Sequence, residues 1–352
     1  MPLKQIRFPR FHPAAVRAAW IAAGAAVVLC VLVLFWPWRV HAPGRQADVT
    51  IGRGLTHADV ARLLGQHGCI RSALLFMACG RLLGWSDDLK AGRYRFQGWE
   101  NNFSVLRRLV LGQTLFEKIT FPEGIRAVQI AGLLQRNAGL DSTEIMGLVR
   151  NPDLCRRLGV EASTLEGYLY PDTYWYETME RTDGILQRMV TRFNGIVSDS
   201  LRQLAQSRGW TIHELVTLAS IVEGEVQLDS ERTMVAAVFI NRLKKGLPLQ
   251  ACATVQYLLP GGPRRLLERD LRIDSPYNTY LYPGLPPGPV NNPGIRSIRA
   301  VLHPALTPFL YFVANGDGSH TFSRTLDEHN AAKRRFNQIR NKVNQSRKTG
   351  VR

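Results

Sequence analysis

The sequence predicts an α+β protein that is tied to a membrane by one N-terminal helix. A run without charged residues extends from 18 to 38, and about 20 apolar residues are enough for a helix to span a bilayer. After it, short stretches of strand-like alternation are mixed with segments of helical periodicity. The 352 residues, 45% of them hydrophobic, suffice for two domains with cores of their own.

The flanks of the apolar run predict its orientation. No acidic residue occurs before Asp48, and four basic residues precede the run, which favours a cytoplasmic N-terminus; these are Lys4, Arg7, Arg10 and Arg17. Three arginines that follow the run act against this orientation. A cleaved signal peptide would have a shorter apolar stretch, and Val40-His41-Ala42 only faintly resembles a cleavage site. We therefore expect a retained anchor, with interfacial indole rings at Trp20, Trp36 and Trp38.

The charge balance indicates an anionic partner. Lys and Arg outnumber Asp and Glu by 45 to 28, a net charge of +17. Nucleic acid, anionic lipid and an acidic wall polymer would all be attracted. The anchor and the lack of interleaved aromatic residues in the basic C-terminal end predict no nucleic-acid partner. We interpret this end as a solvated helix terminus, and the alternative is a patch that binds anionic polymer or lipid.

Two modules are expected after a linker at 41–48. The first, at 49–113, is a compact mixture of short elements: helices at 56–64, 72–83 and 104–111 and a strand at 93–96. The second, at 114–340, begins with a strand at 116–121, followed by helices at 126–135 and 143–149, one long amphipathic helix at 182–207, and further helices starting at 211 and 230. A basic tail completes the chain at 341–352.

Glu223 is the first candidate for chemistry. Thr211 and Glu214 form a capping box that starts a helix, and Glu223 continues the apolar face that Leu215 and Val222 define. Burial disfavours a charged carboxylate, which suits a general acid. The alternative is a structural carboxylate that reaches solvent from the helix end or pairs with a buried arginine such as Arg242.

Loops rich in Tyr, Asn, Pro and Gly follow, at 274–280, 284–289 and 292–294. Such loops present rings and amides that can bind sugars, although they also occur as inert turns. The second histidine of a zinc-protease helix would have to fall at Thr217, and no phosphate loop, dinucleotide fingerprint or nucleophile elbow is present. We expect no metal and no cofactor, and interpret the cysteines as free thiols.

Several segments together resemble the membrane-anchored endolytic murein transglycosylases of the MltG or YceG-like family. The order and spacing of these segments are similar to the family from the anchor to about Asn337; they are 165–174 (LEGYLYPDTY), 219–223 (ASIVE), 239–243 (FINRL), 277–280 (YNTY), 284–288 (GLPPG) and 320–322 (HTF).

The resemblance implies roles for both modules and for single residues. Residues 49–113 are similar to a LysM-like module that grips peptidoglycan, and 114–340 to a YceG-like catalytic region. Glu223 matches the catalytic glutamate, and the residues implied to line the glycan cleft are Glu225, Gln250, Tyr277 and Asn278. From its own surroundings, however, Glu225 is expected to form a plain ion pair. Many relatives carry Asp where this chain has Cys252, and Asp274 is the candidate replacement.

The implied activity is cleavage of the MurNAc–GlcNAc bond of nascent glycan strands, with Glu223 as the single acid and base and a 1,6-anhydromuramyl product. The alternatives are a non-catalytic peptidoglycan-binding membrane protein and a hydrolytic muramidase, which needs a second carboxylate. The expected partners are glycan strands and cell-wall synthases. The expected location is the bacterial inner membrane, crossed once, with the catalytic region outside the cytoplasm.

Overall fold

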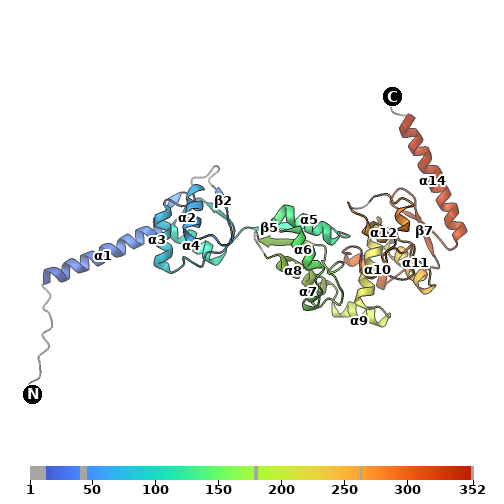
Figure 1. The fold of residues 1–352 in the computed structure, drawn as a ribbon, viewed down its shortest axis with the longest axis horizontal. Coiled ribbons are helices and arrows are strands. Elements are labelled where there is room, and N and C mark those ends of the chain that lie inside the picture. The colour runs from blue at the N-terminus through green and yellow to red at the C-terminus, as the bar shows by residue number, and fades with distance from the viewer. Residues whose placement is uncertain (1–12, 40–45, 178–180, 262–263, 350–352) are drawn as a thin grey trace, which may run out of the picture. The chain divides into compact units, whose positions relative to one another are not determined.

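The computed structural model describes residues 13–39, 46–177, 181–261 and 264–349 (Figure 1). The chain divides into two compact units, which are described separately. Unit 1 comprises residues 1–117 and 176–180, and unit 2 comprises 118–175 and 181–352. The predicted cytoplasmic tail, with Lys4, Arg7 and Arg10, falls mainly outside the described residues.

Unit 1 begins with helix α1 (Pro13–Phe35). Its segment Arg17–Phe35 is long and apolar enough to cross a membrane, as a retained anchor or as a signal sequence. The helix ends at Phe35 and not at Trp38 as predicted, because Pro37 has no backbone N–H to continue it.

The remainder of unit 1 has the expected mixture of helices and strands. Strand β2 (Gln46–Ile51) pairs antiparallel with β3 (Gly92–Gln97), and β1 (Trp38–Arg39) pairs with β4 (Trp99–Glu100). Three helices cover them: α2 (His57–Gln66), α3 (Ala73–Leu83) and α4 (Asn102–Leu111). Their shared hydrophobic core includes Val49, Leu64, Phe76, Phe96 and Leu106.

Unit 2 is mostly helical. Strands β5 (Phe116–Thr120) and β6 (Thr173–Glu177) pair, and the unit boundary falls within both. The other elements are α5 (Ala127–Ala138), α6 (Ser142–Val149), α7 (Pro152–Arg157), α8 (Thr182–Ile196), α9 (Asp199–Ser207), α10 (Ile212–Glu225), η2 (Asp229–Glu231), α11 (Arg232–Lys244), α12 (Cys252–Leu258), η3 (Asp270–Arg272), α13 (Ile295–Leu302), β7 (Tyr311–Ala314), β8 (His320–Ser323) and α14 (Leu326–Thr349).

The single helix predicted at 182–207 is wrong, because two helices meet at Val197 and Ser198. Ser198 has extended backbone angles, and Asp199 starts the next helix, a start signal that a count of apolar positions overlooks. The Arg202 side chain stabilises the break, since its Nε donates to the Val197 carbonyl at 3.0 Å.

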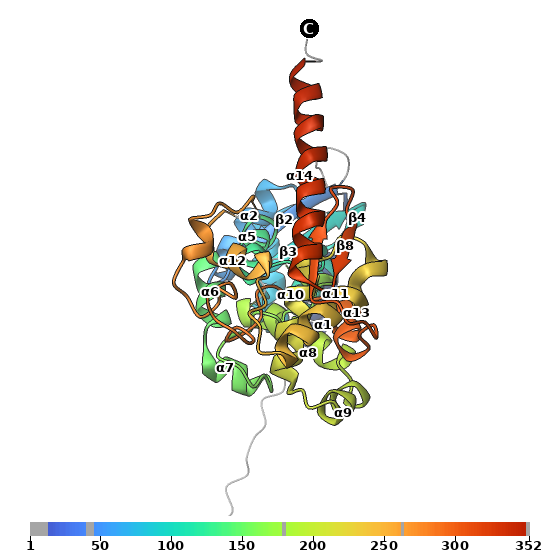
Figure 2. The same ribbon diagram turned by 90° about the vertical axis from the view of Figure 1, so that its right-hand side faces the viewer.

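Helix α10 is the centre of unit 2 and packs against α11, α12 and α13. The capping box of Thr211 and Glu214 is present, as predicted. Every side chain from Leu215 to Val222 is buried, so the helix is enclosed on all sides and not on one face. Helix α14, which continues through the predicted tail boundary at 340, runs outward from the rest of unit 2 (Figures 1 and 2).

Candidate active site

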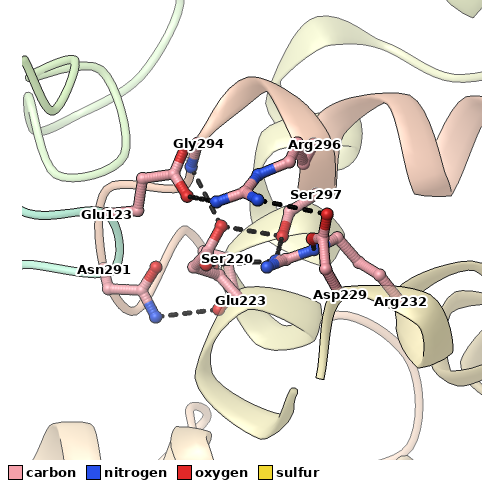
Figure 3. Close-up of polar contacts among 9 residues, drawn as sticks. All are labelled: Glu123, Ser220, Glu223, Asp229, Arg232, Asn291, Gly294, Arg296 and Ser297. Atoms are coloured by element: carbon pink, nitrogen blue, oxygen red, sulfur yellow. Dashed lines mark hydrogen bonds and ion pairs between the residues drawn. The ribbon is translucent and has the colours of Figure 1, made fainter. Parts of the chain in front are cut away.

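The Glu223 carboxylate lies in a closed network at the end of α10 (Figure 3). Its Oε1 pairs with the Arg232 guanidinium at 3.1 Å, and both side chains are less than a tenth exposed. Its Oε2 accepts hydrogen bonds from Ser297 Oγ at 2.7 Å and from the Gly294 backbone N–H at 3.0 Å. A cation and two donors thus compensate the carboxylate charge.

A second layer of charges surrounds this pair. Arg232 also contacts Asp229 at 2.8 Å, and Arg296 bridges Asp229 at 3.1 Å and Glu123 at 2.9 Å (Figure 3). Glu123 follows β5, so the network joins the 122–124 turn to α10, α11 and α13. The buried-arginine alternative for Glu223 is therefore realised, with Arg232 as the partner and not Arg242.

Glu225 has different surroundings, although only Gly224 separates it from Glu223. Its Oε1 accepts a hydrogen bond from the Ala253 backbone N–H at 2.9 Å, at the start of α12. No arginine or lysine among the described residues forms an ion pair with it, so the ion pair expected for Glu225 is wrong. Burial raises its pKa to about 7, and the backbone donors of Ala253 and Cys252 only partly oppose this.

Glu225 opens onto a cavity of about 510 Å³. Around it the walls carry polar and aromatic side chains, chiefly Arg242, Gln250, Cys252, Tyr280, Tyr311, His320 and Lys333. Arg242 was missed as a site residue, although it belongs to the 239–243 segment. Its guanidinium donates to Gln250 Oε1 at 2.7 Å and lies over the Tyr311 ring.

Gln250 is held in an unusual backbone conformation. Its φ of 53° is the only positive value at a non-glycine residue in the described ranges. Such a conformation is costly for a residue with a Cβ and is found mainly where surrounding contacts enforce it. The Gln250 N–H donates to Thr279 O at 2.9 Å, and the side chain is fixed by Arg242, so the amide is directed at the cavity wall.

The cavity does not include two of the predicted substrate-binding residues. Asn278 is fully buried, and its Nδ2 donates to the carbonyls of Leu271 and Ile273. Tyr277 instead packs against Tyr257, with ring centroids 5.0 Å apart. The predicted set therefore separates into Glu225 and Gln250, which share the cavity, and Tyr277 and Asn278, which do not line it.

Cys252 faces Glu225 within this cavity. Burial and the nearby Glu225 raise the pKa of its thiol to about 11, and the Sγ lies 3.3 Å from Tyr280 Oη. Asp274, the expected replacement for an aspartate here, is bonded to Tyr282 Oη at 2.6 Å and does not line the cavity. All five cysteines are free.

The 165–174 segment does not line the cavity, but its hydrogen bonds hold the loop before α13 in place. Glu166 is buried, accepts from the Ala127 N–H at 2.9 Å, and contacts Asn292 Nδ2 at 3.1 Å. Burial raises the pKa of Glu166 to about 7. Asn292 Oδ1 in turn accepts from the N–H groups of Gly167 and Leu169, which fixes this segment beside the loop before α13. Within the described ranges, no group of His, Cys, Asp and Glu has the geometry of a metal site.

Comparisons with known proteins agree on one family. A family model described as the YceG-like family matches residues 49–335. An endolytic murein transglycosylase of Bacillus subtilis is 31% identical over 305 residues, covering 82% of this chain and 84% of that protein. One from Streptococcus pneumoniae is 29% identical, covering 80% of this chain and 57% of that protein. The crystal structure of a YceG-like protein from Listeria monocytogenes is 31% identical, covers 82% of this chain and 99% of that one, and has a TM-score of 0.58.

Proposed function

Because this chain belongs to the YceG-like family, we propose that it is an endolytic murein transglycosylase that cleaves the MurNAc–GlcNAc bond of nascent glycan strands. The names of its relatives support the substrate class. The observation that carries the proposal is that Glu225 is the sole carboxylate among the described residues lining the 510 Å³ cavity. Hydrolytic glycosidases need two carboxylates, whereas this reaction needs one.

We assign the proton transfers to Glu225. A pKa of about 7 lets this carboxyl hold a proton near neutral pH. The acid donates that proton to the glycosidic oxygen as the C1–O bond breaks, which releases the GlcNAc hydroxyl. The carboxylate then takes the proton of the muramyl C6 hydroxyl while O6 bonds to C1, which closes the 1,6-anhydro ring and restores the acid. Neither water nor a cofactor enters this balance.

Glu223, the predicted acid, is proposed to have a positioning role. Its carboxylate is paired with Arg232 and is not among the residues lining the cavity. The geometry favours Glu225, because a catalytic acid must be reached by the glycosidic oxygen.

The cavity walls suit a muramyl glycan. Tyr280 offers its ring to sugar rings, and Gln250 offers an amide to hydroxyls. Arg242 and Lys333 supply positive charge for the carboxylates that muramyl units and their peptides carry. Tyr277 and Asn278 are proposed to stabilise the loop next to this wall.

The proposed location follows from the substrate. Murein lies outside the cytoplasm, so α1 is proposed to cross the bacterial inner membrane once, with its N-terminus inside and unit 2 outside. The 49–113 module is proposed to act as a LysM-like module that binds peptidoglycan. Cell-wall synthases are the partner class that releases strands at the same surface.

The test uses the full chain on murein, with product ends identified by mass spectrometry. Wild type and Glu223→Gln should give anhydromuramyl ends, and Glu225→Gln should lose about a hundredfold or more in rate. Reducing ends would instead identify a muramidase. Binding without any cleavage by the wild type would identify a non-catalytic wall-binding protein. A variant Glu225→Gln with unchanged rate would overturn the assignment of the acid.

A further inference from the structure

Helix α3 is apolar on both its buried and its exposed side. Phe76 and Cys79 face the core of unit 1. The opposite side presents Leu74 and Leu82, which are 75% and 56% exposed, together with Leu75 at 38%. These positions fall on one stripe of a helix. A helix that is apolar all round belongs in a protein core or in lipid, and the side chains of Leu74 and Leu82 leave most of this stripe uncovered.

The neighbouring helix α2 is the internal contrast. It has a capping box, as α4 has, and its exposed side is polar, with Arg62 at its centre. The exposed side of α3 is thus apolar where the exposed side of the neighbouring α2 is polar.

Helix α3 is fixed beside the end of α1. The Val33 carbonyl would ordinarily accept from the N–H of residue 37, but that residue is Pro37. Two groups of the module replace it: Asn102 Nδ2 donates at 2.7 Å and Cys79 Sγ at 3.3 Å. The rings of Phe35 and Phe103 also lie 5.2 Å apart. The last turns of α1 and the module are thus one packed structure.

The length of α1 determines the depth of this contact. A bilayer core takes about 20 helical residues, and the segment long enough to cross comprises the 19 residues Arg17–Phe35. Almost all of α1 is therefore needed to span. Leu29 and Leu32 nevertheless share a cavity of about 230 Å³ with Ile70 and Leu75 of the module. If α1 spans, Leu75 must lie at the level of the acyl chains of the leaflet on the module's side.

Aromatic and basic side chains agree with that depth. Trp36 and Trp99, at the junction of α1 with β4, are 53% and 69% exposed, and indole rings favour the boundary between lipid and water. Arg81 is the single basic residue on the exposed stripe of α3. Its long side chain can reach the phosphates while its stem stays in apolar surroundings.

We propose that the exposed face of α3 is a membrane-contacting surface, which lies in the lipid leaflet from which α1 emerges. This proposal rests on the proposed crossing of the membrane by α1, but not on the transglycosylase activity. The occupant of the apolar face is phospholipid, since the face is continuous with the lipid-exposed surface of α1. The α3 contact would keep unit 1 at the membrane surface and would restrict its rotation about the anchor.

Depth-dependent fluorescence quenching tests the proposal in the full chain, reconstituted into phosphatidylcholine–phosphatidylglycerol vesicles. Cys30 and Cys252 are replaced by alanine, and the buried Cys69, Cys79 and Cys155, whose thiol pKa values are raised, react slowly. A bimane label is placed at Leu74→Cys or Leu82→Cys, and at Arg62→Cys on α2 as the matched control. The quencher is a lipid with a doxyl group near the top of its acyl chain.

The expected result is quenching of about twofold or more at positions 74 and 82, with little at position 62, since interfacial apolar faces sit roughly 5–10 Å below the headgroups. Flotation with the vesicles and resistance to alkaline extraction report whether α1 is inserted. An inserted chain with equal quenching at 62, 74 and 82 would overturn the α3 contact alone. A chain that does not float would overturn the membrane crossing and the α3 contact together.

Discussion

Glu223 and Glu225 leave the last turn of α10 toward different surroundings. The Glu223 carboxylate lies 3.1 Å from the Arg232 guanidinium, whereas the Glu225 carboxylate accepts from the Ala253 N–H at 2.9 Å beside an open cavity. Positions i and i+2 of a helix do not face each other. The same helix end therefore carries one carboxylate in an ion pair, that of Glu223, and one with no ion-pair partner among the described residues, that of Glu225. In the proposed function, this division gives Glu223 a structural role and Glu225 the chemical one.

Replacing Glu223 should mainly affect stability. The variant Glu223→Gln removes the buried partner of Arg232 and leaves it only the half-exposed Asp229, and loss of one member of a buried pair costs about 3–5 kcal/mol. Chemical denaturation of the wild type, Glu223→Gln, Arg232→Met and the double variant measures the coupling. The double variant should recover part of the loss. Additive losses would contradict a direct Glu223–Arg232 pair.

The rate of glycan cleavage should fall as the pH rises. Only the protonated form of Glu225 can act as the acid, and its pKa is about 7. The ratio kcat/KM should therefore be level below this value and decrease about tenfold per pH unit above it. The measurement is a pH–rate profile on isolated glycan strands. A profile that stays level through pH 9 would exclude Glu225 as the acid.

A carboxylate at position 252 should move that profile to higher pH. Cys252 lies beside Glu225, and its side chain already contributes to the wall of the same cavity. Cys252→Asp would add a like charge, which disfavours ionisation of Glu225 and raises its pKa. Cys252→Asn, which has a similar shape and no charge, is the control. Identical profiles for the two variants would contradict electrostatic coupling between positions 252 and 225.

Gly224 should resist substitution by alanine. A Cβ there would lie 2.6 Å from Ala253 Cβ, so α12 would have to move away from α10 and loosen the Ala253–Glu225 hydrogen bond. Overpacking of this kind costs about 1–3 kcal/mol, and kcat should fall as well. Gly195→Ala in α8, where a Cβ meets nothing within 4 Å, should be neutral or stabilising by about 0.5–1 kcal/mol. Thermal unfolding measures the stability of both variants relative to the wild type.

Glu166 should make the fold less stable at high pH. Its pKa is about 7 in the folded protein and ordinarily 4.5, so the folded state binds its proton more tightly. The free energy of unfolding therefore declines as the pH rises from about 4.5 to 7, by roughly 3 kcal/mol in total. Glu166→Gln retains the oxygen that accepts from Ala127 and removes the titration. The free energy of unfolding of the variant, relative to that of the wild type, should increase between pH 4.5 and pH 8. A difference between the two proteins that does not change with pH would contradict this.

Most of the local elements follow from signals in the sequence alone. The apolar run predicts α1, the Thr211–Glu214 capping box predicts the start of α10, and the alternation of side chains at 93–96 predicts β3. These signals are local, because caps, turns and periodicity act over a few residues. The break at Val197 was missed since apolar spacing continued across a start signal.

Which of the two glutamates lines the cavity depends on the tertiary fold. Helical periodicity predicts the face on which Glu223 lies, but not that Arg232, Ser297 and Gly294 close around it. Asn278 was likewise expected at the cavity wall and is buried against the carbonyls of its own loop. The cause is the same for both residues: charge compensation and exposure depend on segments far apart in the chain, which only packing around α10 brings together.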